Sequence, residues 1–169
     1  MEPVIKGRQK LERFLGKAID KNARTALVGI GNRDRYDDFV GVYVIQRLQA
    51  KGLRKENLLL VEARDAPTQF ITEIYDWKPE CVIMIDALDA KEAAGEVLSI
   101  PKDALHKHSV DSHSNAKLLL LDFLLGLIPD LRVHVLGIQV RDISFAKKLS
   151  KEVQASAEWL IEFLYKLLE

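Results

Sequence analysis

Short runs of apolar residues alternate with amphipathic segments along most of this chain. Five of these runs stand out, and most of them are continuous and rich in Val, Ile and Leu, which is typical of strands that are covered on both faces. They predict strands at residues 26–30, 58–62, 82–87, 97–100 and 132–138. The run at 97–100 is short, and we expect it to pair antiparallel at an edge of the sheet.

Between these runs, apolar residues recur at the three- and four-residue spacing of a helix face. The spacing predicts helices at residues 40–51, 68–76, 115–127 and from Ser150 onward, with Ser150 as the N-cap. Residues 4–21 are predicted to form a further amphipathic helix that packs on the main fold. The alternation of strands and helices indicates an α/β fold, in which a twisted, mostly parallel sheet forms the middle of a three-layer sandwich with helices on both faces.

The length and composition fit one domain. The chain has 169 residues, of which 48% are hydrophobic, and no repeat or linker divides it. We expect a single domain over residues 1–169, with a helical extension at 1–24 and the main fold at 25–169. Lys+Arg and Asp+Glu both number 25, so the net charge does not favour nucleic acid or an anionic membrane.

The apolar runs are too short to span a membrane, and the N-terminal residues lack the apolar core of a signal peptide. The sequence contains one cysteine, which excludes an internal disulfide and a multi-cysteine zinc site. These features predict a soluble, cytoplasmic protein. Cys81 itself opens an apolar strand and is expected to be a small buried side chain.

The segment from Gly29 to Gly41 joins the first of these strands to the helix that follows it. A dinucleotide-binding fingerprint needs a small residue three positions after its second glycine, but Asp34 stands there. The neighbouring acids Asp37 and Asp38 would also repel a pyrophosphate at the start of the helix. We therefore expect no nucleotide cofactor.

Acidic and imidazole side chains lie at the ends of predicted strands or in the loops beyond them. Asp38 follows the first strand of the main fold, Asp86 follows the apolar run 82–85, and His113 stands at the entrance to helix 115–127. Because the carboxyl ends of parallel strands meet at one edge of a sheet, these three side chains can converge. Two carboxylates and one imidazole suit a divalent metal such as nickel, zinc, manganese or iron.

Each of these residues also has a structural alternative. Asp38 can stabilise the helix dipole, Asp86 can accept bonds from backbone amides, and His113 can be a polar residue at a helix entry. Their joint position at one crevice favours a site. Weaker candidates are the histidines of His106-Lys107-His108, predicted to be solvated in a polar loop, and His134, predicted to be a structural residue on a sheet face.

The sequence contains no GxSxG, HExxH or CGxCW segment, so the machinery of common serine, zinc and papain-like hydrolases is absent. If the protein is hydrolytic, a metal or a water held by a carboxylate must act instead.

Several short segments follow one another along the chain in a specific order. They are Gly29-Ile30-Gly31-Asn32, Asp37-Asp38 followed by Gly41, Ala66-Pro67 with Phe70, Val82-Ile83-Met84-Ile85-Asp86-Ala87, Ser112-His113-Ser114, and Leu136-Gly137-Ile138-Gln139 followed by Leu149-Ser150. Taken together, from residue 25 onward, they resemble the [NiFe]-hydrogenase maturation endopeptidases. Phe39 stands where this family usually has glycine or alanine, and residues 62–65 lack the glycine-containing turn of many members.

The resemblance implies an α/β sandwich with a five-stranded sheet and an aspartic-type endopeptidase activity. Its expected substrate and partner is the precursor of the hydrogenase large subunit, which loses a C-terminal extension after nickel insertion. Asp38, Asp86 and His113 correspond to the metal-contacting and catalytic residues of the family. The expected metal is nickel supplied by that precursor, with another divalent metal able to bind in vitro, and neither nucleic acid nor a membrane is an expected partner.

Two other functions fit the same residues. One is an autonomous metal-dependent peptidase or amidohydrolase that holds its metal permanently. The other is a non-catalytic chaperone that checks metal insertion and cleaves nothing.

Overall fold

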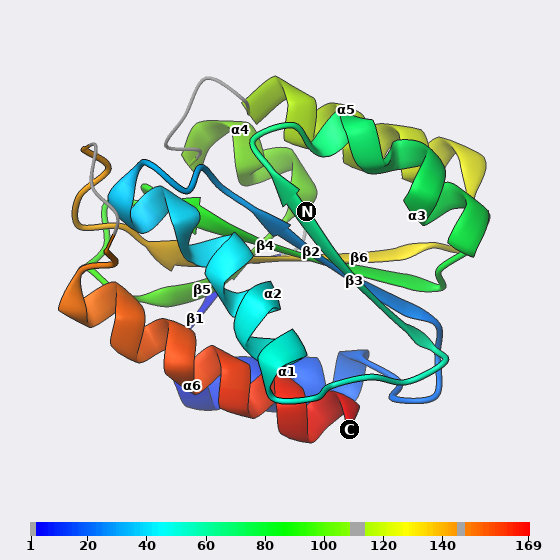
Figure 1. Cartoon of the computed structure of the whole chain (residues 1–169), viewed down its shortest axis with the longest axis horizontal. Coiled ribbons are helices and arrows are strands. Elements are labelled where there is room, and N and C mark those ends of the chain that lie inside the picture. The colour runs from blue at the N-terminus through cyan, green and yellow to red at the C-terminus, as the bar shows by residue number, and fades with distance from the viewer. Residues whose placement is uncertain (1–2, 109–113, 145–147) are drawn as a thin grey trace.

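The computed structural model describes residues 3–108, 114–144 and 148–169. Strands and helices alternate through most of the chain, as the apolar pattern predicts (Figure 1). The elements are β1 (Ile5–Lys6), α1 (Arg8–Ala18), β2 (Thr25–Ile30), η1 (Tyr36–Phe39), α2 (Val40–Ala50), β3 (Leu58–Arg64), η2 (Pro67–Phe70), α3 (Ile71–Trp77), β4 (Cys81–Leu88), β5 (Val97–Ile100), η3 (Lys102–Ala104), α4 (Leu105–His108), α5 (Ser114–Leu127), β6 (Arg132–Gln139) and α6 (Lys151–Leu168).

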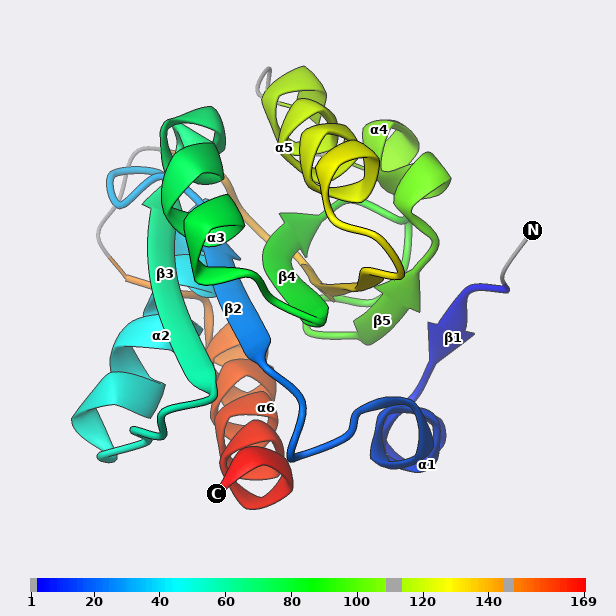
Figure 2. The same ribbon diagram turned by 90° about the vertical axis from the view of Figure 1, so that its right-hand side faces the viewer.

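The sheet has six strands in the order β1-β5-β6-β4-β2-β3, so the expectation of five strands was one too low. The pairs β2–β3, β2–β4 and β4–β6 are parallel, and β5 pairs antiparallel with β6 as predicted. However, β5 is not at the edge, because β1 pairs with its other side. Figure 2 shows β1 at this end of the sheet and β3 at the opposite end.

The additional strand comes from residues that the sequence pattern places in the helix 4–21. Gly7 separates β1 from α1 and has a φ of 94°, a conformation that glycine adopts readily and that cannot continue a helix. The helix begins at Arg8, and the residues before it are extended along β5. Leu11 and Leu15 are buried, so the amphipathic character predicted for this helix is confirmed.

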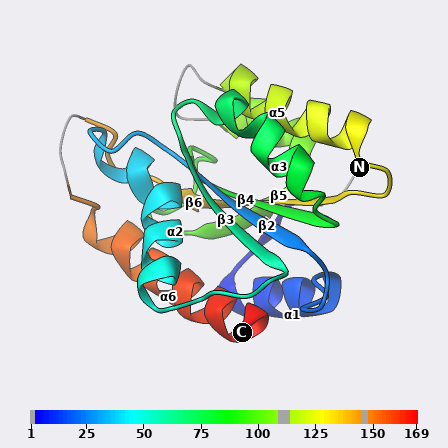
Figure 3. The ribbon, with the colours of Figure 1, turned by 45° about the vertical axis from the view of Figure 1, so that its right-hand side comes forward.

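Helices cover both faces of the sheet, which confirms the three-layer α/β sandwich (Figure 3). The helices α1, α2 and α6 enclose one core, and α3, α4 and α5 enclose the other. In β4, Cys81, Ile83 and Ile85 belong to the first core, whereas Val82 and Met84 belong to the second. This alternation follows from the two-residue period of a strand and explains why β4 is apolar throughout.

The predicted helix at 68–76 is divided into η2 and α3, and the segment containing His108 forms the short helix α4 instead of the predicted polar loop. The other predicted strands and helices are observed, with small shifts at their ends. Among the described helices, none has both the length and the apolar character required to cross a membrane.

Candidate active site

The carboxyl ends of β2 and β4, two neighbouring parallel strands, carry the acidic residues of the candidate site. Asp37 and Asp38 lie in η1, beyond the end of β2, and Asp86 lies near the end of β4. The η1 turn packs against β4. Asp38 and Asp86 therefore lie on the same side of the sheet, at the carboxyl ends of its parallel strands, as the sequence predicts.

Two glycines allow η1 to approach the carboxyl ends of β2 and β4. Gly31 has a φ of 141°, and a Cβ at this position would lie 1.9 Å from the carbonyl oxygen of Asp38. A Cβ at Gly41 would lie 2.2 Å from the carbonyl oxygen of Ile85 and 2.4 Å from that of Ile30. All three distances are too short for any side chain, so glycine is required at both positions for the close packing that positions Asp38.

Asp38 is buried, with 2% of the residue exposed. Its Oδ2 accepts a hydrogen bond of 3.1 Å from the backbone amide of Asn32, in the loop that follows β2. Tyr36, two residues earlier, has a φ of 45°, which is unfavourable for a residue with a side chain. Strained residues of this kind often occur at functional sites.

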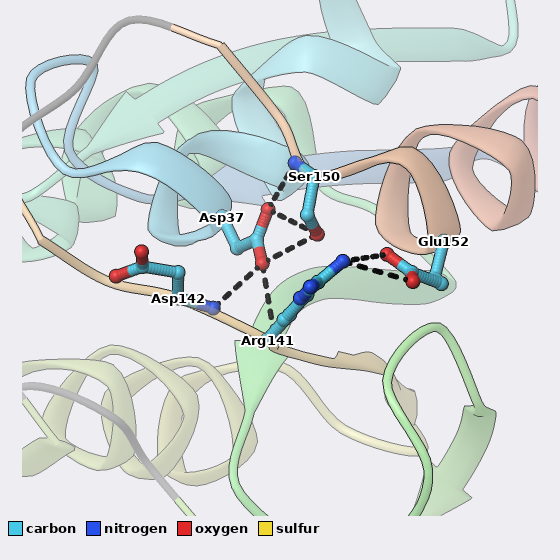
Figure 4. A network of polar contacts seen from close by, with 5 residues as sticks. All are labelled: Asp37, Arg141, Asp142, Ser150 and Glu152. Atoms are coloured by element: carbon cyan, nitrogen blue, oxygen red, sulfur yellow. Dashed lines mark hydrogen bonds and ion pairs between the residues drawn. The ribbon is translucent and has the colours of Figure 1, made fainter.

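Asp37, in contrast, joins three segments of the fold (Figure 4). Its Oδ2 accepts hydrogen bonds from the backbone amides of Arg141 at 2.8 Å and Asp142 at 3.0 Å. Its Oδ1 accepts bonds from the backbone amide of Ser150 at 2.7 Å and from the Ser150 hydroxyl at 2.9 Å. Asp37 therefore fixes η1 to the chain beyond β6 and to the start of α6.

Ser150 is at the N-cap of α6, as predicted, but its hydroxyl does not cap the helix. The hydroxyl contacts both carboxylate oxygens of Asp37 instead. Arg141 and Glu152 form an exposed ion pair beside this network, at 3.1 Å. No local pattern predicts the Asp37–Ser150 contact, because the two residues are far apart along the chain.

Asp86 is completely buried, and each of its carboxylate oxygens accepts a hydrogen bond. Oδ1 accepts a hydrogen bond of 2.9 Å from the backbone amide of Ala87, which agrees with the structural alternative that Asp86 accepts bonds from backbone amides. Oδ2 lies 2.7 Å from the Nζ of Lys117, whose side chain is also 0% exposed. The sequence analysis did not identify Lys117.

The position of Asp86 in β4 explains this ion pair. Asp86 has the same parity as Val82 and Met84, so its side chain faces the layer that contains α5. Lys117 lies on the buried face of α5 with Leu120, Leu121 and Leu124. A lysine on the otherwise apolar buried face of this helix was the available sequence signal.

His113, the third predicted site residue, lies outside the described residues. It directly precedes α5 in the sequence, and Lys117 in the first turns of that helix reaches Asp86. Within the described parts of the chain, no group of three or more His, Cys, Asp and Glu side chains is arranged to hold a metal ion. The convergence of His113 with Asp38 and Asp86 stays a prediction.

Gln139, at the end of β6, connects the loop after β4 to the sheet. Its Oε1 accepts hydrogen bonds from the backbone amides of Ala90 at 2.8 Å and Glu92 at 3.3 Å. Its Nε2 donates to the carbonyl oxygen of Val140 at 3.1 Å. The side chain thereby stabilises the chain just beyond Asp86.

The remaining candidates have structural surroundings. The ring of His134 packs edge-to-face on Phe14 of α1, with ring centroids 5.8 Å apart, which agrees with a structural role. Cys81 is buried as predicted, and burial raises the pKa of its thiol to about 11. Phe39, the departure beside Asp38, contacts Tyr43 with ring centroids 6.4 Å apart.

Comparison with known proteins identifies the family. The model of the hydrogenase maturation protease family matches residues 42–167, which is more than half of the chain. The chain belongs to this family. A protein of Methanocaldococcus jannaschii, provisionally described as a hydrogenase maturation protease, is 30% identical over 152 residues, covering 86% of this chain and 89% of its own.

Solved structures of the family have the same fold. The [NiFe] hydrogenase maturation protease HybD from Thermococcus kodakarensis is 25% identical, with a TM-score of 0.71, over 86% of this chain and 99% of its own. The endopeptidase HycI from Escherichia coli is 24% identical, with the same TM-score of 0.71, over 82% of this chain and 86% of its own. The resemblance seen in the sequence motifs is therefore confirmed at the level of the hydrogenase maturation protease family.

Proposed function

We propose that this protein is an endopeptidase that removes the C-terminal extension of a [NiFe]-hydrogenase large-subunit precursor after nickel has been inserted. The observation that carries the proposal is the pair of buried carboxylates, Asp38 and Asp86, at one edge of the sheet in a chain of the maturation protease family. We assign Asp38, Asp86 and His113 as the residues that contact the precursor's nickel. A cytoplasmic location, favoured by the single cysteine, is part of the same proposal.

The two neighbouring acids have separate tasks in this proposal. Asp37 already accepts hydrogen bonds on both oxygens and holds η1 in place. Asp38 accepts a bond from Asn32 and belongs to the same edge as Asp86. We therefore assign the nickel contact to Asp38. Asp37 contributes only by holding the backbone of η1 in position.

In this proposal the nickel belongs to the substrate and reports that insertion is complete. Oxygen and nitrogen ligands from the protease complete the coordination of a nickel that the precursor already holds. These contacts position the scissile peptide bond, and the metal can polarise its carbonyl group or a water as a Lewis acid. A precursor without nickel lacks these contacts and the binding free energy that they supply, so it is not processed.

The decisive test is mass spectrometry of a large-subunit precursor incubated with the protease, with and without nickel loaded. We expect loss of a C-terminal peptide from the loaded precursor alone. Binding of the loaded precursor without any loss of mass would contradict the proposal and favour the chaperone. Tight, stoichiometric metal in the purified protease, together with cleavage of the nickel-free precursor, would favour the autonomous metallopeptidase.

The residue assignment is tested with Asp38→Asn. We expect processing to fall at least about 100-fold, the order of magnitude that loss of one electrostatic contact at a reacting group costs. Asp34→Asn is the matched control, since Asp34 is an exposed acid of the same loop and should leave processing unchanged. Normal processing by Asp38→Asn would remove Asp38 from the site.

A further inference from the structure

The ion pair between Lys117 and Asp86 needs an explanation beyond stability. Lys117 is among the largest fully buried side chains of the described residues, and it stands on the apolar face of α5. Burying a lysine and a carboxylate is costly even when the two are paired. Apolar residues of similar volume at such positions are often equally or more stabilising. The pair is therefore a candidate for a functional role.

The contact places the positive charge of Lys117 beside Asp86, the carboxylate that we assign to the nickel site. Lys117 Nζ lies 2.7 Å from Asp86 Oδ2, while Asp86 Oδ1 accepts the amide of Ala87 at 2.9 Å. An ammonium group has three donors and no acceptor, so in this state it repels a metal cation and cannot bind it. Because both side chains are completely buried, solvent screens this repulsion little.

We propose that Lys117 is the internal counter-cation of Asp86 and excludes free divalent metal from the site. The inference rests on the proposed role of Asp86 as a nickel contact. A free ion would have to displace the ammonium without compensation. Nickel that arrives on the precursor brings the binding free energy of the protein–protein contact, which can be used for this displacement. The flexible four-carbon stem of lysine allows the ammonium to move without unfolding α5.

Lys117 is thus a specificity residue that makes the site respond to metal on the substrate and not to metal in solution. Its charge also explains why a lysine, and not one of the leucines that fill this face of α5, occupies a core position.

The test measures metal binding without any precursor. We would titrate chelator-treated protein with Ni²⁺ and with Zn²⁺ by calorimetry, comparing the native chain with Lys117→Gln. The glutamine amide can still donate a hydrogen bond to Asp86 but carries no charge. We expect affinity for both ions to rise on the order of 100-fold, because a repelling charge in contact with the ligand is removed. Unchanged affinity in a folded Lys117→Gln variant would overturn the inference.

Two further variants serve as controls. Lys117→Arg retains the charge and should bind metal no better than the native chain. Lys102→Gln removes the exposed ion pair, at 2.6 Å, between Lys102 and Asp122 of α5. It should also leave metal affinity unchanged. An equal gain in either control would overturn the inference, since the gain would then not depend on the charge at position 117.

If Lys117→Gln unfolds in chelator, added Ni²⁺ or Zn²⁺ should refold it, since a ligand that binds only the folded state stabilises that state. Failure of both ions to refold it would overturn the inference.

The processing assay separates this inference from the proposed function. Processing of nickel-loaded precursor by Lys117→Gln should become sensitive to free Zn²⁺ that leaves the native enzyme active. Loss of processing in Asp86→Asn with no gain of metal affinity in Lys117→Gln would refute only the role of Lys117. Normal processing by Asp86→Asn would refute the assignment of Asp86 to the nickel contact, and with it the inference about Lys117, but would leave the proposed processing function standing.

Discussion

Asp37 and Asp38 are adjacent and both are buried, yet their carboxylates have different surroundings. Asp37 accepts hydrogen bonds from two segments that follow it by more than a hundred residues. Asp38 accepts one from Asn32, six residues before it. One carboxylate therefore holds the fold together at this edge, and the other is assigned to the nickel contact.

Asp37→Ala should lower stability strongly. The substitution leaves the amides of Arg141, Asp142 and Ser150 without their acceptor, and each buried donor that stays unsatisfied costs about 1–3 kcal/mol. Since water can reach part of this region, we expect a decrease of about 2–4 kcal/mol in the free energy of unfolding. Urea unfolding measures it.

Asp38→Asn is the comparison for this prediction, because we expect it to change stability far less than Asp37→Ala while it abolishes processing. An Asp37→Ala variant of native stability that nevertheless cannot process the precursor would transfer the catalytic role to Asp37.

At the level of elements, α2 can pack directly against the backbone of the sheet because Gly41 has no side chain. The carbonyl groups of Ile30 in β2 and Ile85 in β4 occupy the space that a Cβ would need. Ile85 immediately precedes Asp86, so the packing that brings α2 to the sheet also brings η1 and its acids to Asp86. The same glycine therefore serves both the core and the site.

Gly41→Ala should separate α2 from the sheet. We expect it to destabilise the protein by about 1–3 kcal/mol, the usual cost of overpacking a core, and to reduce processing as well. Gly16→Ala is the matched control, because Gly16 is also in a helix but has no atom within 4 Å of the added Cβ. There we expect a gain of about 0.5–1 kcal/mol from lower backbone entropy in the unfolded chain. Thermal unfolding of both variants checks the difference in sign.

At the scale of the whole molecule, the sheet separates two apolar cores, and Cys81 lies in the core under α1, α2 and α6. Burial raises the pKa of its thiol from 9.0 to about 11. Below pH 9 the thiol is protonated in both the folded and the unfolded chain, so it has no effect on the pH dependence of stability. Between pH 9 and 11 the unfolded chain loses this proton and the folded chain retains it.

The free energy of unfolding should therefore fall as pH rises from 9 to 11. The contribution of Cys81 reaches about 2–3 kcal/mol, at about 1.4 kcal/mol for each pH unit over which one proton is released. Urea unfolding at several pH values, compared with Cys81→Ala, isolates it from other titrating groups. A Cys81→Ala variant with the same alkaline loss of stability would show that the thiol is not responsible.

The local pattern was sufficient to predict most of the secondary structure. The runs now seen as β2 and β4 are apolar at nearly all positions, and this pattern occurs when both faces of a strand are covered. The period-2 and period-3.6 patterns depend only on neighbours within one element. The strand β1 could not be found in this way, because its two residues are extended by pairing with β5, which follows more than ninety residues later.

The order of apolar runs along the chain was enough to predict the fold class and to place Asp38 and Asp86 at the carboxyl ends of parallel strands, because a parallel arrangement puts these ends on one side of the sheet. The contact of Asp37 with Ser150 and the ion pair of Lys117 with Asp86 are visible only in the folded protein. Both contacts join segments that are distant in sequence, and their geometry depends on how helices pack on the sheet. Hydrophobic periodicity records which face of an element is buried, but not which side chain it meets there.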